Sequence, residues 1–221
     1  YIGDAIVAFY GAPAPVQDQE KKACSTALVM RNKLEELRGK WKNENDWPDI
    51  VYSMQHRIGL NSGQMVTGNM GSEMRMNYTM MGDTVNLAAR LEASAKQYGI
   101  YIQVAEETYA ACKDKFIWRD LDYVIVMGKT EPAQVFELIS EEQNMPPGYD
   151  KLLPAYNEAL KLYRNQDWVK AIDAFKASDE LEDMFPGRKT NPSKIYIPRC
   201  EHYRDNPPGD EWDGSWALTK K

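Results

Sequence analysis

Residues 78–92, which read YTMMGDTVNLAARLE, contain the clearest change of pattern in the chain. A β-strand is expected to end near Met80, and Asp83 is a suitable N-cap for the helix that follows. Apolar residues in this helix recur at steps of three and four, which predicts one buried stripe. The stripe comprises Ala88, Leu91, Ala95 and Tyr98. Gly99 is expected to end the helix.

The same helix carries two long polar side chains, Asn86 and Arg90. They lie four positions apart, so they share one face of the helix. Ala88 lies roughly opposite Asn86, and the apolar stripe therefore faces away from the polar pair. Taken alone, such a pair is more often a solvated surface than a site.

Four strands and one helix are predicted before residue 83. The strands are expected at residues 5–10, 52–60, 65–67 and 76–80. Glycines punctuate the stretch between the last two, which favours a hairpin. The helix is expected to follow Asp18, which can cap it, and to end before a polar loop at residues 40–49.

Three further strands and one short helix are predicted after Gly99. The strands are expected at residues 100–104, 116–126 and 133–139, and the helix at residues 106–113. Strands and helices alternate irregularly, with at least two hairpins. This order favours a mixed or antiparallel sheet covered by helices, so the predicted fold class is α+β.

The last third of the chain changes character. Residues 141–148 are predicted as a linker after an α/β domain at residues 1–140. Residues 149–185 show helical periodicity with one break, which predicts a helical hairpin similar to a single tetratricopeptide unit. One such unit cannot bury both its faces, so it is expected to dock on another surface. Residues 186–221, rich in proline and aromatic residues, are predicted to form an extended tail.

Composition excludes several functional classes. The net charge of −6 argues against nucleic acid as a partner, because binding a phosphate backbone needs a basic face. The three cysteines (Cys24, Cys112 and Cys200) are odd in number and far apart, which fits neither a disulfide framework nor a zinc site. No apolar run approaches the roughly 20 residues that a membrane helix needs. We therefore expect a cytoplasmic protein, or the cytosolic part of one anchored through an upstream region.

Three sequence blocks together resemble the signature segments of class III adenylyl and guanylyl cyclases. They are YIGDAIVAFYGAP at residues 1–13, RIGLNSG at 57–63 with GNMGS at 68–72, and the block at 78–92. The resemblance implies a ferredoxin-like core and a head-to-tail homodimer with sites at its interface. The family's first metal-binding aspartate and base-reading lysine would precede Tyr1, so the N-terminal part of the domain is expected to be missing.

The resemblance also implies roles for three residues. Asp4, in a turn with Gly3, matches the second metal-binding aspartate of the family, which uses two Mg²⁺ or Mn²⁺ ions per site. Carboxylate oxygens with substrate phosphates are ligands that Mg²⁺ prefers. Asn86 matches the residue that holds the ribose, and Arg90 matches the one that stabilises the pentavalent phosphorus. A guanidinium fork suits charge that grows on phosphate oxygens.

Two positions depart from the family pattern. Thr79 stands where many adenylyl cyclases have an aspartate that reads adenine, and a threonine can donate or accept a hydrogen bond. Met127 stands where the family usually has a triphosphate-binding lysine; Lys129, two residues away, either replaces that contact or extends into solvent from the turn, and the solvent-facing position is the better interpretation. Thr79 alone does not fix the base that is bound, and the loss of the lysine at position 127 bears on triphosphate binding.

The sequence therefore predicts an adenylate cyclase that converts ATP to 3′,5′-cyclic AMP and pyrophosphate, with a second copy of the chain as its partner. A guanylate cyclase that uses GTP is the alternative within the same class. A catalytically silent dimerisation or regulatory module is the alternative from another class, and Met127 is the residue that favours it.

Overall fold

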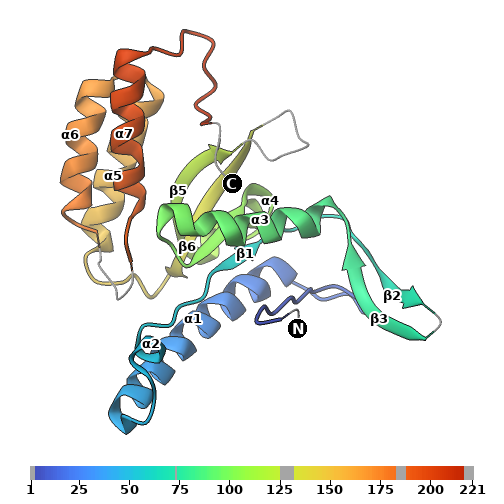
Figure 1. The fold of residues 1–221 in the computed structure, drawn as a ribbon. Coiled ribbons are helices and arrows are strands. Elements are labelled where there is room, and N and C mark those ends of the chain that lie inside the picture. Colours follow the sequence, from blue (N-terminus) through green and yellow to red (C-terminus); the bar gives the residue numbers. More distant parts are fainter. Residues whose placement is uncertain (1–2, 73, 125–131, 183–187, 217–221) are drawn as a thin grey trace.

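The structure is a computed structural model of the 221-residue chain, and it describes residues 3–72, 74–124, 132–182 and 188–216 (Figure 1). Its helices are α1 (Gln19–Glu44), α2 (Asp49–Tyr52), α3 (Asp83–Tyr98), α4 (Glu106–Cys112), the 3₁₀ turn η1 (Lys113–Lys115), α5 (Tyr149–Arg164), α6 (Trp168–Asp179) and α7 (Pro192–Asp205). Its strands are β1 (Ile58–Leu60), β2 (Val66–Ser72), β3 (Arg75–Met81), β4 (Ile102–Ala105), β5 (Phe116–Val124) and β6 (Ala133–Glu141). Within these residues, no helix is long and apolar enough to cross a bilayer.

The main sheet has four strands in the order β1-β4-β6-β5. Strands β1 and β4 are parallel, whereas β6 is antiparallel to both of its neighbours. Alternate residues of β4 face opposite sides: Ile102 and Val104 join a core with α1 and α4, and Ala105 joins a core with α3. The predicted α+β class with a mixed sheet covered by helices is confirmed.

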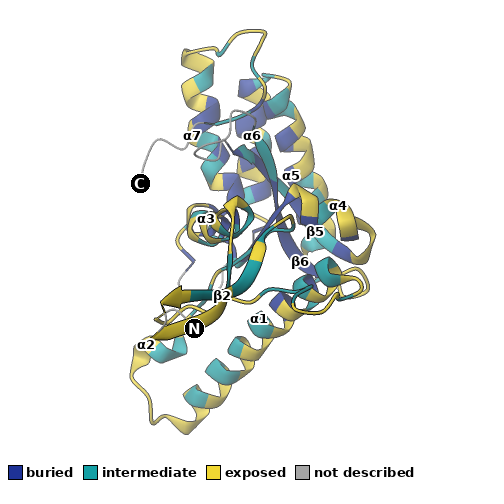
Figure 2. Ribbon diagram, turned by 90° about the vertical axis from the view of Figure 1, so that its right-hand side faces the viewer, coloured by how far each residue is buried: buried dark blue, intermediate teal, exposed yellow. Residues whose placement is uncertain are grey.

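Strands β2 and β3 form a separate two-stranded hairpin that projects from the sheet (Figure 1). The predicted hairpin is confirmed, and its strands are longer than expected, because the pairing runs from Val66 opposite Met81 to Ser72 opposite Arg75. Figure 2 shows the main sheet largely buried and the hairpin largely exposed.

Helix α3 follows β3 directly and ends where the sequence predicts. Gly99 adopts a left-handed conformation (φ 62°) that suits glycine and closes the helix. Leu87 is buried with Leu91, whereas Ala88, predicted in the buried stripe, is half-buried. The N-cap prediction was wrong: Gly82 occupies that position with φ 147°, and Asp83 lies in the first turn.

Three predictions before β2 need correction. Residues 5–10 form no named strand, because a strand requires a partner backbone and, among these six residues, only Ala5 makes an isolated bridge. Of residues 52–60, only Ile58–Leu60 form a strand. The alternating pattern begins at Tyr52, but this residue belongs to the short helix α2. Helix α1 continues to Glu44, five residues into the predicted loop.

The helical hairpin is present as α5 and α6, but residues 186–221 are not wholly an extended tail. Helix α7 occupies Pro192–Asp205 because Asn191 caps it, accepting a hydrogen bond from the Lys194 backbone N–H at 2.8 Å, and Pro192 takes a first-turn position. This helix was not predicted, although the Asn191-Pro192 start signal is present in the sequence.

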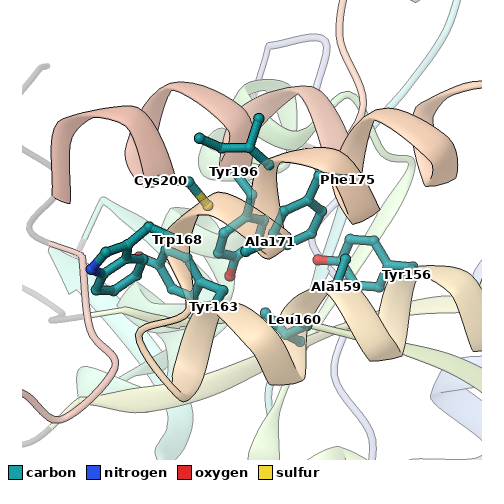
Figure 3. Close-up of a cluster of buried hydrophobic side chains, with 10 residues drawn as sticks. Tyr156, Ala159, Leu160, Tyr163, Trp168, Ala171, Phe175, Tyr196 and Cys200 are labelled. Carbon is teal, nitrogen blue, oxygen red and sulfur yellow. The ribbon is translucent and has the colours of Figure 1, made fainter. Parts of the chain in front are cut away.

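Helices α5, α6 and α7 bury a shared aromatic core (Figure 3). The ring of Tyr163 lies 5.4 Å from that of Trp168 and 4.7 Å from that of Tyr196, in edge-to-face arrangements. The third helix thus covers the hairpin, which the sequence analysis expected to need another surface.

Buried ion pairs join the helical segment α5–α7 to the sheet. Arg119 of β5 is fully buried and contacts Glu137 of β6 and Glu182, which follows α6. Arg199 of α7 contacts Asp122 of β5 at 2.6 Å. The helical hairpin formed by α5 and α6 therefore docks on the main sheet as well as on α7.

Candidate functional site

The exposed face of α3 carries the polar pair that the sequence singles out. Asn86 and Arg90 are both exposed, whereas Leu87 is 6% exposed and packs into the core. Ala89 and Ala93 are exposed on the same face. The small side chains of Ala89 and Ala93, beside Asn86 and Arg90, leave room for a ligand or a second chain to approach.

The start of α3 is held by a set of short polar contacts. The Asn61 side-chain amide donates to the Thr84 carbonyl oxygen at 3.0 Å, and the Thr84 hydroxyl donates to the Gln64 carbonyl oxygen at 2.9 Å. The Asn86 backbone N–H donates to the Gly82 carbonyl oxygen at 3.2 Å. The first turn of α3 is thereby fixed against the segment between β1 and β2.

Thr79 lies on β3 near the point where this strand enters α3. It pairs with Gly68 of β2 and is half-buried. The ring of its neighbour Tyr78 lies 6.1 Å from the ring of Phe9 in the N-terminal segment. The base of the hairpin, the start of α3 and the N-terminal segment thus lie close together.

Asp4 lies in an exposed turn, as predicted, within the N-terminal segment. That segment is also tied to α1, because the Tyr10 hydroxyl donates to the Thr26 hydroxyl oxygen at 2.7 Å. No hydrogen bond or ion pair joins Asp4 to Thr79 or Asn86 within the described part of one chain.

Asp4 can serve a divalent cation only as one ligand among several. The described residues include no group of three or more His, Cys, Asp or Glu side chains able to hold a metal ion. Mg²⁺ is commonly held by one or two carboxylates while substrate phosphates and water complete its shell. An exposed lone carboxylate fits that arrangement and does not fit a closed structural metal site.

The remaining predicted contact, Lys129, lies outside the described residues, as does Met127. Asn61 and Thr84 were not predicted as residues that hold the start of α3. The sequence could have indicated Asn61, since this residue belongs to the RIGLNSG block at residues 57–63.

Strongly shifted pKa values occur away from this site. Burial acts to lower the pKa of Arg199, but the adjacent Asp122 carboxylate outweighs it and the pKa is raised. Burial raises the pKa of Tyr98, whose hydroxyl donates to the same carboxylate at 2.6 Å. Arg199 joins α7 to the sheet and Tyr98 joins α3 to it, so their shifts reflect structural contacts with Asp122 rather than a reactive centre.

Some known proteins resemble most of the chain, and others resemble about two thirds of it. The sequence profile of the adenylate and guanylate cyclase catalytic domain matches residues 1–139. The terminal-differentiation specific adenylate cyclase of Dictyostelium discoideum is 31% identical over 208 residues, covering 90% of this chain and 9% of that protein. Because the profile ends at residue 139, this similarity extends well into the helical segment.

Two bacterial cyclases each match 62% of the chain. Adenylate cyclase 1 of Rhizobium meliloti is 31% identical over 137 residues, covering 62% of this chain and 20% of that protein. The crystal structure of the adenylyl cyclase CyaB from P. aeruginosa superposes with a TM-score of 0.51 at 29% identity, covering 62% of this chain and 68% of that one. The chain spans at most a fifth of the two curated relatives. The chain belongs to the adenylate and guanylate cyclase catalytic domain family.

Proposed function

We propose that this chain forms part of an adenylate cyclase, which converts ATP to 3′,5′-cyclic AMP and pyrophosphate. The observation that carries the proposal is the exposure of Asn86 and Arg90 on one face of α3, opposite its buried side. Similarity to proteins named adenylate cyclases supports ATP as the substrate.

In the proposed reaction, the ribose 3′-hydroxyl attacks the α-phosphorus, its proton is lost, and the bond to pyrophosphate breaks. Negative charge grows on the α-phosphate oxygens in the transition state. The Arg90 guanidinium can donate two hydrogen bonds to those oxygens, which lowers the barrier more than it strengthens ground-state binding. Asn86 would hold the ribose so that its hydroxyl stays in line with the leaving group.

Other contacts complete the proposed site. Thr79 would contact the base, and Lys129 would contact the triphosphate in place of the usual lysine. Asp4 would help to hold divalent cations, two Mg²⁺ or Mn²⁺ per site, which reduce the negative charge of the triphosphate when bound.

We propose further that the site is shared between two copies, with Asp4 from one and Asn86 and Arg90 from the other. Exposed apolar side chains on and beside the β2–β3 hairpin support contact with a second copy. They include Val66, Met74, Met76, Tyr78 and Met81, each at least 46% exposed.

Complementation between two inactive variants tests the shared site in the full-length protein. Asp4→Ala and Arg90→Ala should each lower kcat by roughly 100-fold or more, because each removes charge stabilisation at the phosphate. Random mixing makes half of the dimers mixed, each with one intact site of two, so about a quarter of wild-type activity should return. Arg204→Ala, an exposed arginine paired with its neighbour Asp205, is the matched control and should keep full activity.

Mixed dimers that form but restore no activity would show that the site is not shared. Product analysis with ATP and GTP, each with Mg²⁺ or Mn²⁺, tests the reaction itself. Cyclic GMP in place of cyclic AMP would assign a guanylate cyclase. No cyclic product from either nucleotide would favour the silent module.

A further inference from the structure

Strand β1 and helix α3 contact each other at regular intervals. The residues that make these contacts have no part in the proposed catalytic roles. Alternate residues 57, 59 and 61 of the strand segment contact residues 92, 88 and 84 of the helix. Two strand residues advance by about 6.6 Å and four helix residues by about 6 Å, so the two repeats match over this length. The strand segment and α3 are therefore locked in one antiparallel register.

Each of the three contacts differs in kind. The Arg57 Nε lies 3.1 Å from the Glu92 carboxylate oxygen Oε1, and both side chains are partly exposed. A Cβ atom on Gly59 would lie 2.0 Å from the Ala88 carbonyl oxygen, where at least 3.0 Å is needed. At the far end, the Asn61 amide donates to a carbonyl oxygen in the first turn of α3.

This register determines the direction in which Asn86 and Arg90 point. Each lies two residues beyond a strand-facing position, which is about 200° around the helix. A slip of one helix residue would turn α3 by about 100° and move it about 1.5 Å along its axis. Arg90 would then point about 100° away from its present direction.

We propose that Arg57, Gly59 and Asn61 are positioning residues, which set the rotation and axial position of α3 and so aim Asn86 and Arg90 at the substrate. The aiming role rests on the proposed cyclase function, whereas the register itself does not. The residues on the other strand face, Ile58 and Leu60, pack against the core that includes α1, so β1 cannot yield to a displaced helix.

Two substitutions of the same kind separate positioning from a general loss of stability. Gly59→Ala should push α3 away by about 1 Å, and a misplacement of that size costs about 100-fold in kcat. Gly39→Ala is the matched control, because a Cβ atom there meets nothing within 4 Å, and it should leave kcat unchanged. Asn61→Ala is the milder variant should Gly59→Ala fail to fold, and it should lower kcat about tenfold.

Amide hydrogen exchange, followed by mass spectrometry, gives a second readout that needs no activity. Exchange in residues 83–98 should rise at least about tenfold in Gly59→Ala and Asn61→Ala, while residues 168–179 of α6 remain protected. Exchange unchanged in both variants would overturn the proposed register.

Combined readouts distinguish this proposal from the proposed function. Raised exchange with normal cyclic nucleotide formation would overturn the aiming role and leave the cyclase function standing. Raised exchange in a protein whose wild type makes no cyclic product would support the register and reject the cyclase. The charge-reversed pair Arg57→Glu with Glu92→Arg should recover most of the kcat that either single change loses, and no recovery would exclude their ion pair from the register.

Discussion

At the scale of single residues, the buried charges of β5 stabilise the molecule only as complete pairs. Asp122 accepts hydrogen bonds from Arg199, from the Tyr98 hydroxyl and from the Tyr123 backbone N–H. The Tyr196 hydroxyl donates to the carbonyl oxygen of the neighbouring Leu121. A buried carboxylate with three donors is well satisfied, and the loss of the cationic donor Arg199 leaves its charge without an ion-pair partner among the described residues.

Arg199→Ala should therefore lower the free energy of unfolding by about 3 kcal/mol, measured by urea denaturation. Arg204→Ala, on the exposed side of the same helix, should have no measurable effect, because its ion pair is solvated. A loss smaller than about 1 kcal/mol in Arg199→Ala would show that the pair adds little beyond the packing around it.

At the scale of elements, a side-chain cap fixes where α7 begins, whereas α1, α3, α5 and α6 form without one. Asn191 makes α7 possible despite a proline-rich sequence, because its side chain satisfies an N–H group that has no partner within the helix. Asp18 and Asp83 are good capping residues by type, but neither makes a side-chain cap. A capping residue type is thus a weaker signal than its combination with proline at the next position.

Asn191→Ala should lower the free energy of unfolding by about 1–2 kcal/mol, because it removes the cap and a second hydrogen bond to the Asp179 carboxylate. The measurement is denaturant unfolding followed by circular dichroism. Asn165→Ala is the matched control: it lies at the C-terminal end of α5, is exposed, and should change stability by less than about 0.5 kcal/mol. Equal effects in the two variants would contradict a capping role for Asn191.

At the scale of the whole molecule, the helical segment α5–α7 and the sheet share their buried charges. Arg119 lies within the sheet and pairs with Glu182 beyond α6, and the Arg164 guanidinium of α5 contacts both oxygens of Asp120 on β5. Separating the helical segment from the sheet would leave each of these charges exposed to water or without its ion-pair partner. This coupling opposes independent unfolding of residues 149–185, which the sequence analysis treated as a separate unit.

Thermal unfolding should therefore show a single transition that includes both parts. The calorimetric and van 't Hoff enthalpies should agree, as two-state unfolding requires. Tryptophan fluorescence, which includes Trp168 in the helical core, should change at the same temperature as circular dichroism. Two resolved transitions would show instead that the helical segment is an autonomous domain.

Some residues of the candidate site were predicted from the sequence, and others were not. Asn86 and Arg90 were found because helical periodicity and a family motif coincide in one short segment, and both signals are local. Their exposure follows from the same periodicity, since Leu87 and Leu91 must face the core. The holding contacts from Asn61 and Gly59 were not predicted, because they join segments more than twenty residues apart.

The sequence by itself determined the elements whose signals are local: the hairpin β2–β3, the helix α3 with its glycine end, and the pair α5 and α6. Local patterns also predicted α1, α4 and the strands β4, β5 and β6, whereas tertiary structure alone decided the following features. Residues 5–10 lack a strand, and β1 is short, because strands exist only where another backbone pairs with them. The charges of β5 could be assigned to ion pairs only once distant helices were in place, since burial and partner choice depend on the whole fold.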